Sequence, residues 1–371
     1  MRKIKNVIFG ITGLTLGGAE RVLVDTVNKL SKNYNIKIFT LYSNGELEKE
    51  LNNNITINSL YNKSYNEMNK IQKILIPLKI LLFKKSIYKK HIKNKSNIEV
   101  SFLEGPITRI FSIKDNNVKK IAWVHNDISK VFGKGIKSKI KCNIDKKIYD
   151  KYDKIVCVSQ DNLNKFNEMY NLKEKVIMIP NYIESERILK KSEQKINNIF
   201  SKDQVNFITV ARLVEQKGID RFIEIHAKLI SNGLKNKVYI IGEGPLRESL
   251  NEKIKRMNVE NTFVLLGKKE NPYPYVKYAD CFCLLSYYEG YGMVLEEAKI
   301  LKKPIIVTNT AAREAVVNYK ESNICDNNND AIYKALNDFI INKQINSNNK
   351  ELNLQDNEDT INKINLLLEE K

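Results

Sequence analysis

Short apolar runs rich in β-branched residues alternate with longer segments of helical periodicity along almost the whole chain of 371 residues. This alternation predicts βα units, in which parallel strands form a sheet and helices cover both of its faces. In the first half, strands are expected at Asn6–Phe9, Ile36–Leu41, Ile98–Phe102, Lys120–Val124, Lys154–Val158 and Val176–Ile179. Helices are expected between them at Ala19–Leu30, Asn69–Lys93, Gly105–Ser112, Lys139–Lys151 and Gln160–Tyr170.

A second series of the same kind follows a polar stretch at residues 185–203, which we interpret as a linker because it has little apolar periodicity. Its strands are expected at Val205–Val210, Val238–Ile241, Phe263–Leu266, Cys281–Leu285 and Pro304–Val307, with helices beginning near Ile219, Pro245, Tyr291 and Ala311. The sequence therefore predicts two doubly wound α/β domains, residues 1–184 and 204–343, facing a ligand-binding cleft. Residues 344–371 are expected to form a polar tail and a final helix at Ile361–Leu368.

Composition excludes several other classes of protein. A hydrophobic content of 42% argues against wholesale disorder, and five cysteines without a C-x-x-C pair argue against a disulfide scaffold or a zinc ribbon. The most apolar later stretch, Ile71–Phe83, is too short to span a bilayer and is interrupted by Lys73, Pro77 and Lys79. We therefore expect a cytoplasmic protein without a transmembrane helix.

The excess positive charge is confined to the first half of the chain. Residues 1–180 contain 34 basic and 16 acidic residues, a net charge of +18, whereas residues 181–371 carry +1. Lysines concentrate in residues 69–93, where Ile and Leu recur at helical spacing, and in residues 130–147. Three interpretations are open: an interfacial helix on an anionic membrane, a nucleic-acid-binding surface, or a solvated helix face.

Glycine-bearing loops join predicted strands to predicted helices. The first contains Gly17 and Gly18, and another, Gly242 to Arg247, contains Gly244. Glycine lets the backbone approach a ligand closely, and a helix N-terminus offers free N–H groups to an anion. Neither loop has the spacing of a dinucleotide or P-loop motif, and each is equally consistent with ordinary turn chemistry.

Two cations follow the strand Val205–Val210. Arg212 offers a bidentate fork for phosphate, and Lys217 supplies a point charge five residues later. Because ligands of parallel sheets bind at the carboxyl ends of the strands, both cations are candidates for a phosphate site. The alternative is a pair of solvated surface cations.

The strongest signal is Ser286 to Ala298, which follows the strand Cys281–Leu285. Glu289 falls in the strand-to-helix loop, and Glu297 lies about two turns into the helix. Gly290, Tyr291 and Gly292 lie between them, so that backbone amides face the helix start. Amides suit a diphosphate and a carboxylate suits the paired hydroxyls of a ribose, so this segment predicts a nucleotide diphosphate site.

These segments together resemble the family 4 retaining glycosyltransferases. The resemblance rests on Val210 to Gly218, Gly242 to Arg247 and Glu289 to Ala298, supported by Gly17 to Arg21, Val158-Ser159, Ile179 to Asn181 and Lys303 to Ile306. It covers residues 1 to about 320 in the family's order and spacing. It implies a GT-B fold, which consists of two Rossmann-like domains. It also implies that the second domain holds most of a nucleotide-sugar donor.

The resemblance also implies roles at the matched positions. Arg212 and Lys217 would hold the donor diphosphate without a metal, and Glu289 would lie at the donor hexose. Glu297 would bind the ribose hydroxyls. The amides of Gly290, Tyr291 and Gly292 would lie near the sugar and phosphate. Gly17 and Gly18 would close over the phosphates from the first domain. This sequence departs from the family at Ala211, where glycine is usual, and at Tyr182, where Asn-Gly is common.

His125 ends the strand Lys120–Val124 and is one of three histidines. Taken alone, a histidine at a strand end is consistent with a hydrogen-bonded structural residue. In the family a histidine at this place lies beside the transferred sugar, so we expect sugar positioning and no nucleophilic role. Asp127 is a candidate acceptor contact or a helix N-cap.

The expected function is hexosyl transfer from a nucleotide-sugar, a UDP-hexose or UDP-N-acetylhexosamine, to a lipid-linked glycan in capsule, exopolysaccharide or O-antigen synthesis. We expect no cofactor, no metal and no nucleic-acid partner, and peripheral attachment to the inner face of the cell membrane through residues 69–93 and 130–147. The alternatives are a nucleotide-sugar epimerase of related fold and a basic nucleic-acid-binding protein.

Overall fold

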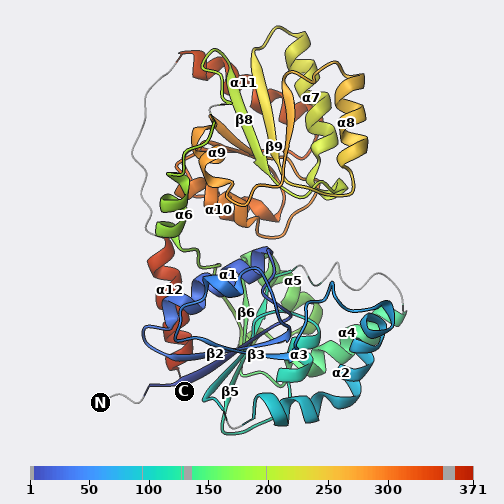
Figure 1. Ribbon diagram of the computed structural model, residues 1–371, viewed down its shortest axis with the longest axis vertical. Helices are drawn as coiled ribbons and strands as arrows, with labels where there is room; N and C mark the ends of the chain where they lie inside the picture. The colour runs from blue at the N-terminus through green and yellow to red at the C-terminus, as the bar shows by residue number, and fades with distance from the viewer. Residues whose placement is uncertain are drawn as a thin grey trace. The chain divides into compact units, whose positions relative to one another are not determined.

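A computed structural model describes residues 4–93, 95–126, 128, 136–197, 199–345 and 356–370. The chain divides into two units, each built on its own parallel sheet (Figure 1). Unit 1 comprises residues 1–183 and 356–371, and unit 2 comprises residues 184–355. This is the α/β architecture that the alternation of strands and helices predicts.

Unit 1 contains a seven-stranded sheet in the order β3-β2-β1-β4-β5-β6-β7. Its strands are β1 (Asn6–Ile11), β2 (Asn35–Tyr42), β3 (Thr56–Tyr61), β4 (Ile98–Ser101), β5 (Lys119–Val124), β6 (Lys154–Cys157) and β7 (Val176–Met178). Its helices are α1 (Gly18–Leu30), α2 (Lys70–His91), α3 (Pro106–Phe111), α4 (Ile136–Tyr149), α5 (Gln160–Tyr170) and α12 (Asp356–Glu369). Every pair of neighbouring strands is parallel.

Unit 2 contains a six-stranded parallel sheet in the order β10-β9-β8-β11-β12-β13. Its strands are β8 (Val205–Val210), β9 (Asn236–Ile241), β10 (Phe263–Gly267), β11 (Cys281–Leu284), β12 (Ile305–Thr308) and β13 (Ser322–Cys325). Its helices are α6 (Ser185–Ser192), α7 (Ile219–Ser231), α8 (Arg247–Arg256), α9 (Tyr273–Tyr278), α10 (Met293–Ile300) and α11 (Asn329–Ile345).

Both sheets reverse their strand order beside their first strand. β1 lies between β2 and β4, and β8 lies between β9 and β11. At such a switch point the loops that follow the two central strands diverge to opposite faces of the sheet, which leaves a crevice at their carboxyl ends. The loops after β8 and β11 are therefore where a ligand of unit 2 is expected.

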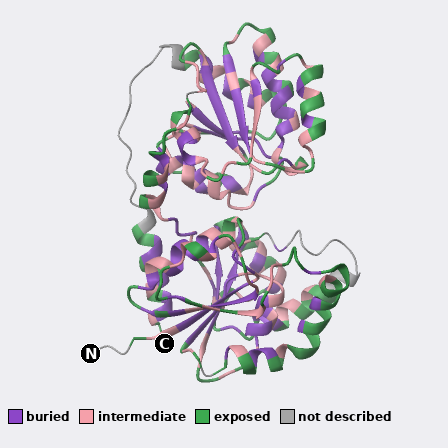
Figure 2. Cartoon of the chain, viewed as in Figure 1, coloured by how far each residue is buried: buried purple, intermediate pink, exposed green. Residues whose placement is uncertain are grey.

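The cores lie between each sheet and its helices, and the outer helix faces are exposed (Figure 2). Most strands of both sheets are buried along their length, as Figure 2 shows in purple. Their continuous runs of Val, Ile and Phe fit a sheet with both faces covered. Among the described residues, no helix combines the length and the apolar character needed to cross a membrane.

The structure corrects the expected pattern at several elements. The stretch taken as a linker begins with α6, whose Ile188 is fully buried and which packs against α9 and α10. The helix expected from Ala311 is a short 3₁₀ turn, and the long helix α11 begins only at Asn329. β3 and β13 were not expected; both are edge strands, whose lower burial leaves a weak hydrophobic signal.

The final helix that the sequence predicts at Ile361–Leu368 is α12, and the structure assigns it to unit 1, which the sequence did not indicate. Lysine side chains satisfy the carbonyl groups at its C-terminal end. Lys5 Nζ lies 2.8 Å from the Leu368 oxygen, and Lys119 Nζ lies 2.7 Å from the Leu367 oxygen. Cations at this end of a helix also interact favourably with its dipole. Residues 346–355 of the expected polar tail lie outside the described residues.

Candidate functional site

In unit 2, the loops after β8 and β11 are joined by an ion pair. Lys217 Nζ lies 2.5 Å from Glu289 Oε1, and the Ser286 hydroxyl lies 2.5 Å from the same oxygen. Glu289 is only 8% exposed, so its charge is compensated by the ammonium and the hydroxyl instead of by bulk water. The structure thus brings together two residues predicted from separate motifs.

Further bonds fix the two loops against each other. The Leu285 carbonyl accepts hydrogen bonds from Arg221 Nε at 2.8 Å and Nη2 at 2.5 Å. Gly218 has φ of +62°, and a Cβ there would lie 2.3 Å from the same carbonyl oxygen. Glycine is therefore required beside Lys217, and Arg221, which the sequence analysis did not single out, anchors the start of the β11 loop.

Arg212 lies at the same carboxyl edge, directly after β8. Its side chain is exposed, and among the described residues it has no carboxylate partner. A guanidinium in this state is available to an anionic ligand. Ala211, which replaces the family's usual glycine, is not among the described non-glycine residues with positive φ, so the substitution causes no backbone strain there.

The β9 loop packs directly on the β8 loop. A Cβ at Gly244 would lie 2.4 Å from the Leu213 carbonyl oxygen, and one at Gly242 would lie 1.8 Å from that of Ala211. The Leu213 amide donates to the Glu243 carbonyl at 3.0 Å. Close packing of two backbones explains both glycines, and the predicted contact of Gly244 with the donor stays a prediction.

The segment before α10 has the geometry of a tight turn into a helix. Gly292 caps α10 with φ of +72°, and a Cβ there would lie 2.9 Å from that of Ala312. Gly290 has no atom within 4 Å of such a position, so space remains beside its backbone. The Tyr291 hydroxyl donates to Glu296 Oε1 at 2.8 Å.

Glu297 on α10 is held by a side chain that the sequence analysis missed. The Tyr273 hydroxyl of α9 lies 3.1 Å from Glu297 Oε1, and Arg187 Nη1 lies 3.3 Å from that hydroxyl. Burial, together with the charge of Glu297, raises the pKa of Tyr273, so the phenol stays protonated and donates. The contact orients one carboxylate oxygen of Glu297, the residue expected to bind ribose.

In unit 1, the glycine pair lies at the start of α1. Gly17 is the N-cap in an extended conformation and Gly18 is the first helical residue. A Cβ at Gly17 would lie 2.2 Å from Glu20 Oε2, the flexible end of a side chain. The geometry is that of an open helix N-terminus, and contact with donor phosphates stays a prediction.

His125 follows β5, and its ring packs 4.7 Å from that of Phe102, measured between centroids. Burial lowers the pKa of His125 to about 3, so the imidazole is neutral at physiological pH. Nε2 is buried and has no hydrogen-bond partner among the described residues. An unpaired buried nitrogen at the carboxyl edge of the sheet is consistent with a substrate contact.

Glu104 supports this position and was not predicted. Its Oε1 accepts hydrogen bonds from the backbone amides of His125 at 2.6 Å and Asn126 at 2.7 Å, and Oε2 accepts one from Asn126 Nδ2 at 3.2 Å. Burial raises the pKa of Glu104, and the backbone hydrogen bonds oppose that rise. The sequence signal that could have identified Glu104 is its place just after the strand Ile98–Ser101, at the edge of the sheet where ligands bind. Asp127 lies outside the described residues.

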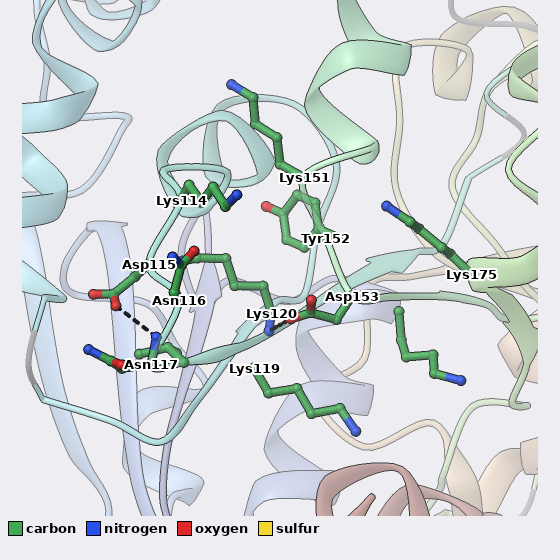
Figure 3. Close-up of a pocket in the computed structure, with 12 residues that line it drawn as sticks. Lys114, Asp115, Asn116, Asn117, Lys119, Lys120, Lys151, Tyr152, Asp153 and Lys175 are labelled. Carbon is green, nitrogen blue, oxygen red and sulfur yellow. Dashed lines mark hydrogen bonds between the residues drawn. The ribbon is translucent and has the colours of Figure 1, made fainter. Parts of the chain in front are cut away.

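A cavity of about 740 Å³ lies elsewhere in unit 1, at the amino ends of β5 and β6 (Figure 3). None of the predicted site residues lines it. Lysines of this cavity have partners already: Lys120 pairs with the buried Glu99, and Lys175 pairs with Asp150. Because it occupies the edge opposite to His125, we assign it no part in the candidate site.

Comparison with known proteins gives the class. Residues 190–357 match the family model described as glycosyl transferases group 1. An uncharacterized glycosyltransferase of Methanocaldococcus jannaschii is 32% identical over 225 residues, 59% of this chain but only 55% of that protein. The amylovoran biosynthesis glycosyltransferase AmsD of Erwinia amylovora is 24% identical, covering 94% of this chain and 93% of its own.

Two further comparisons concern glycan substrates. The N-acetylgalactosamine-N,N'-diacetylbacillosaminyl-diphospho-undecaprenol 4-alpha-N-acetylgalactosaminyltransferase of Campylobacter jejuni is 28% identical, covering 82% of this chain and 81% of its own. The crystal structure of Anabaena Alr3699/HepE in complex with UDP and glucose has a TM-score of 0.69 at 14% identity, covering 92% of this chain and 91% of that one.

The two parallel-sheet units have the GT-B glycosyltransferase fold. Residues 190–357 thus match the glycosyl transferase group 1 family, and glycosyltransferases are similar to most of the chain, which confirms the resemblance seen in its motifs.

Proposed function

We propose that this protein is a retaining glycosyltransferase that moves a hexose from a UDP-sugar to a hydroxyl of a lipid-linked glycan. The Lys217–Glu289 ion pair at the switch point of unit 2, with the exposed guanidinium of Arg212 on the same edge, carries this proposal. The UDP bound by HepE and the undecaprenol-linked substrate named for the Campylobacter enzyme support the choice of donor and acceptor.

In the proposed reaction, unit 2 holds the donor. Arg212 and Lys217 would hold the diphosphate and stabilise the negative charge that develops as the nucleotide leaves. The ion pair to Glu289 fixes Lys217 in advance, so that little ordering is needed at the moment of reaction. Glu297, oriented by Tyr273, would accept hydrogen bonds from the ribose hydroxyls.

Unit 1 would position the sugars. A neutral His125 cannot supply a positive charge, but its unpaired Nε2 can exchange a hydrogen bond with a sugar hydroxyl. We propose no nucleophilic role for it. The relative AmsD is named for biosynthesis of the polysaccharide amylovoran, which supports a place in surface-polysaccharide synthesis.

The acceptor would be reached at a membrane surface through α2. Seven large apolar side chains of this helix are at least half exposed: Ile71, Ile74, Leu75, Leu78, Leu81, Leu82 and Phe83. The described part of the other basic segment adds Ile140 and Ile144 of α4, and both helices are largely exposed in Figure 2. Apolar residues flanked by lysines suit insertion beside anionic headgroups.

A transfer assay tests the proposal. The wild-type protein is incubated with UDP-, GDP- and ADP-sugars and with undecaprenyl-diphosphate-linked saccharides, and products are separated by mass. We expect sugar transfer from one UDP-sugar. Isomerised donor without acceptor would indicate an epimerase instead. Sedimentation with anionic but not neutral liposomes is expected, and Ile71→Ser/Ile74→Ser should weaken it.

A further inference from the structure

Three tyrosines form a cluster at the carboxyl edge of the sheet in unit 1. Tyr42 ends β2 and Tyr61 ends β3, where the two residues are partners in register, and Tyr65 follows in the next loop. The ring of Tyr42 lies 6.0 Å from that of Tyr61 and 5.3 Å from that of Tyr65, measured between centroids. Core residues lie beneath Tyr42 and Tyr61, whereas Tyr65 is 47% exposed.

The phenol hydroxyls of this cluster are available to a ligand. Among the described residues none of the three makes a hydrogen bond. Burial and the two neighbouring tyrosines raise the pKa of Tyr42 to about 12, so the group remains a donor at physiological pH. Aromatic rings that also carry hydroxyl groups suit the alternating apolar and polar faces of a sugar ring.

Two lysines from the first half of α2 cover the cluster. Lys73 Nζ lies 4.8 Å from the ring centroid of Tyr65, and Lys79 Nζ lies 5.2 Å from that of Tyr61. In the described part of the chain neither ammonium has a carboxylate partner, and α2 itself contains no acidic residue. Two uncompensated cations within one helix attract a doubly charged group such as a diphosphate.

The cluster lies between the places proposed for the two ends of the acceptor, the reacting sugar near His125 and the lipid on α2. β2 is separated from β5, which leads into His125, by three strand spacings, on the order of 14 Å. The same helix that supplies Lys73 and Lys79 carries the exposed leucines and isoleucines described above. This spacing leaves room for an oligosaccharide that extends from the lysines toward the centre of the sheet while its lipid lies against α2.

We propose that Tyr42, Tyr61, Tyr65, Lys73 and Lys79 form a subsite for the saccharide-diphosphate head of a membrane-held polyprenyl acceptor. The inference rests on the proposed function and adds the place where the acceptor binds. The tyrosines contact the sugar nearest the lipid, and the two lysines bind the diphosphate.

Binding to lipid nanodiscs tests the subsite in the full-length protein. Neutral phosphatidylcholine discs carry either undecaprenyl-diphospho-N-acetylglucosamine or undecaprenyl diphosphate, and affinity is measured by surface plasmon resonance. Tyr65→Ala should weaken binding of the sugar-bearing lipid about tenfold and leave the sugar-free lipid unchanged. Tyr278→Ala, at an exposed tyrosine of unit 2, is the matched control.

Charge is tested with paired lysine variants of unit 1. Lys73→Ala/Lys79→Ala should weaken binding of both lipids about tenfold or more. Lys32→Ala/Lys173→Ala removes the same charge at exposed positions outside residues 69–93 and 130–147 and should not weaken it. The proposed subsite would be overturned if both lysine pairs lost the same lipid affinity, or if Tyr65→Ala bound the sugar-bearing lipid as tightly as the wild-type protein does. The affinity of each variant for UDP, measured on the same samples, should equal that of the wild-type protein. If the wild-type protein binds no UDP, the assignment of the donor is refuted, but the comparison of lipid binding between variants still tests the subsite.

Discussion

The ammonium of Lys217 and the carboxylate of Glu289 lie 2.5 Å apart, although 72 residues separate them in the sequence. β8 and β11 are neighbours only because the strand order of unit 2 reverses there. The pair is thus a product of topology, and it places a cation and an acid side by side where a donor diphosphate and its sugar are proposed to bind.

Arg212 is expected to contribute to transfer and not to stability. Arg212→Ala should lower kcat/KM about 100-fold or more, because a cation that stabilises the leaving diphosphate is lost. Since the side chain is exposed, the free energy of unfolding should change by less than about 0.5 kcal/mol. Initial rates and urea denaturation measure the two effects. Arg256→Ala, at another exposed arginine of unit 2, is the control, and equal turnover of the two variants would contradict the assignment.

The Lys217–Glu289 pair is expected to couple strongly. Lys217→Ala should destabilise unit 2 by about 1–3 kcal/mol, because it leaves a nearly buried carboxylate without its cation. Lys217→Ala/Glu289→Ala should cost less than the sum of the single variants. The exposed pair Lys277–Glu193 supplies a control cycle, with coupling of about 0–1 kcal/mol. A coupling no larger than in this control would contradict the prediction.

His226 should make unit 2 less stable in acid. It is fully buried between Asn236 and Thr262, and burial lowers its pKa to about 4. The unfolded chain takes up this proton near pH 6.5, so stability is complete above that value and is lost as the pH falls toward 4. Between pH 7 and pH 5 the loss should be about 2 kcal/mol.

Hydrogen exchange of β9 and β10, which reports on unit 2, measures the effect of His226. His226→Gln should lower stability at pH 7, because it disrupts two buried hydrogen bonds, but should flatten the pH dependence. An unchanged slope in this variant would show that other groups cause the acid sensitivity.

Glu104 is expected to act through His125. In Glu104→Gln, one of the two oxygens becomes an NH₂ group, which cannot accept the hydrogen bonds that the carboxylate receives from the 125–126 segment. We expect kcat to fall about tenfold or more with little change in UDP affinity, since the donor is proposed to bind unit 2. Glu168→Gln, at an exposed acid of unit 1, is the control, and a loss confined to UDP affinity would argue against this role.

Local sequence patterns were sufficient for the buried elements and for the motifs. The strand Cys281–Leu284 is a continuous apolar run, and the helix Gln160–Tyr170 was predicted with its observed bounds. Sharp turns at glycines such as Gly292 could also be predicted locally, because glycine adopts a positive φ without steric cost. The edge strand β3 was missed because most of its residues are exposed or only partly buried. Helix α6 was missed because it is only eight residues long and only two of them, Ile188 and Leu189, are apolar.

The sequence by itself thus determined two βα series, the class of fold and the loops that carry Arg212, Lys217, Glu289 and Glu297. The tertiary structure alone decided which side chains meet: Lys217 with Glu289, Tyr273 with Glu297, Glu104 with the backbone of His125, and Tyr42 with Tyr61. Strand order and side-chain contact depend on how distant segments pack, and no local periodicity encodes that packing.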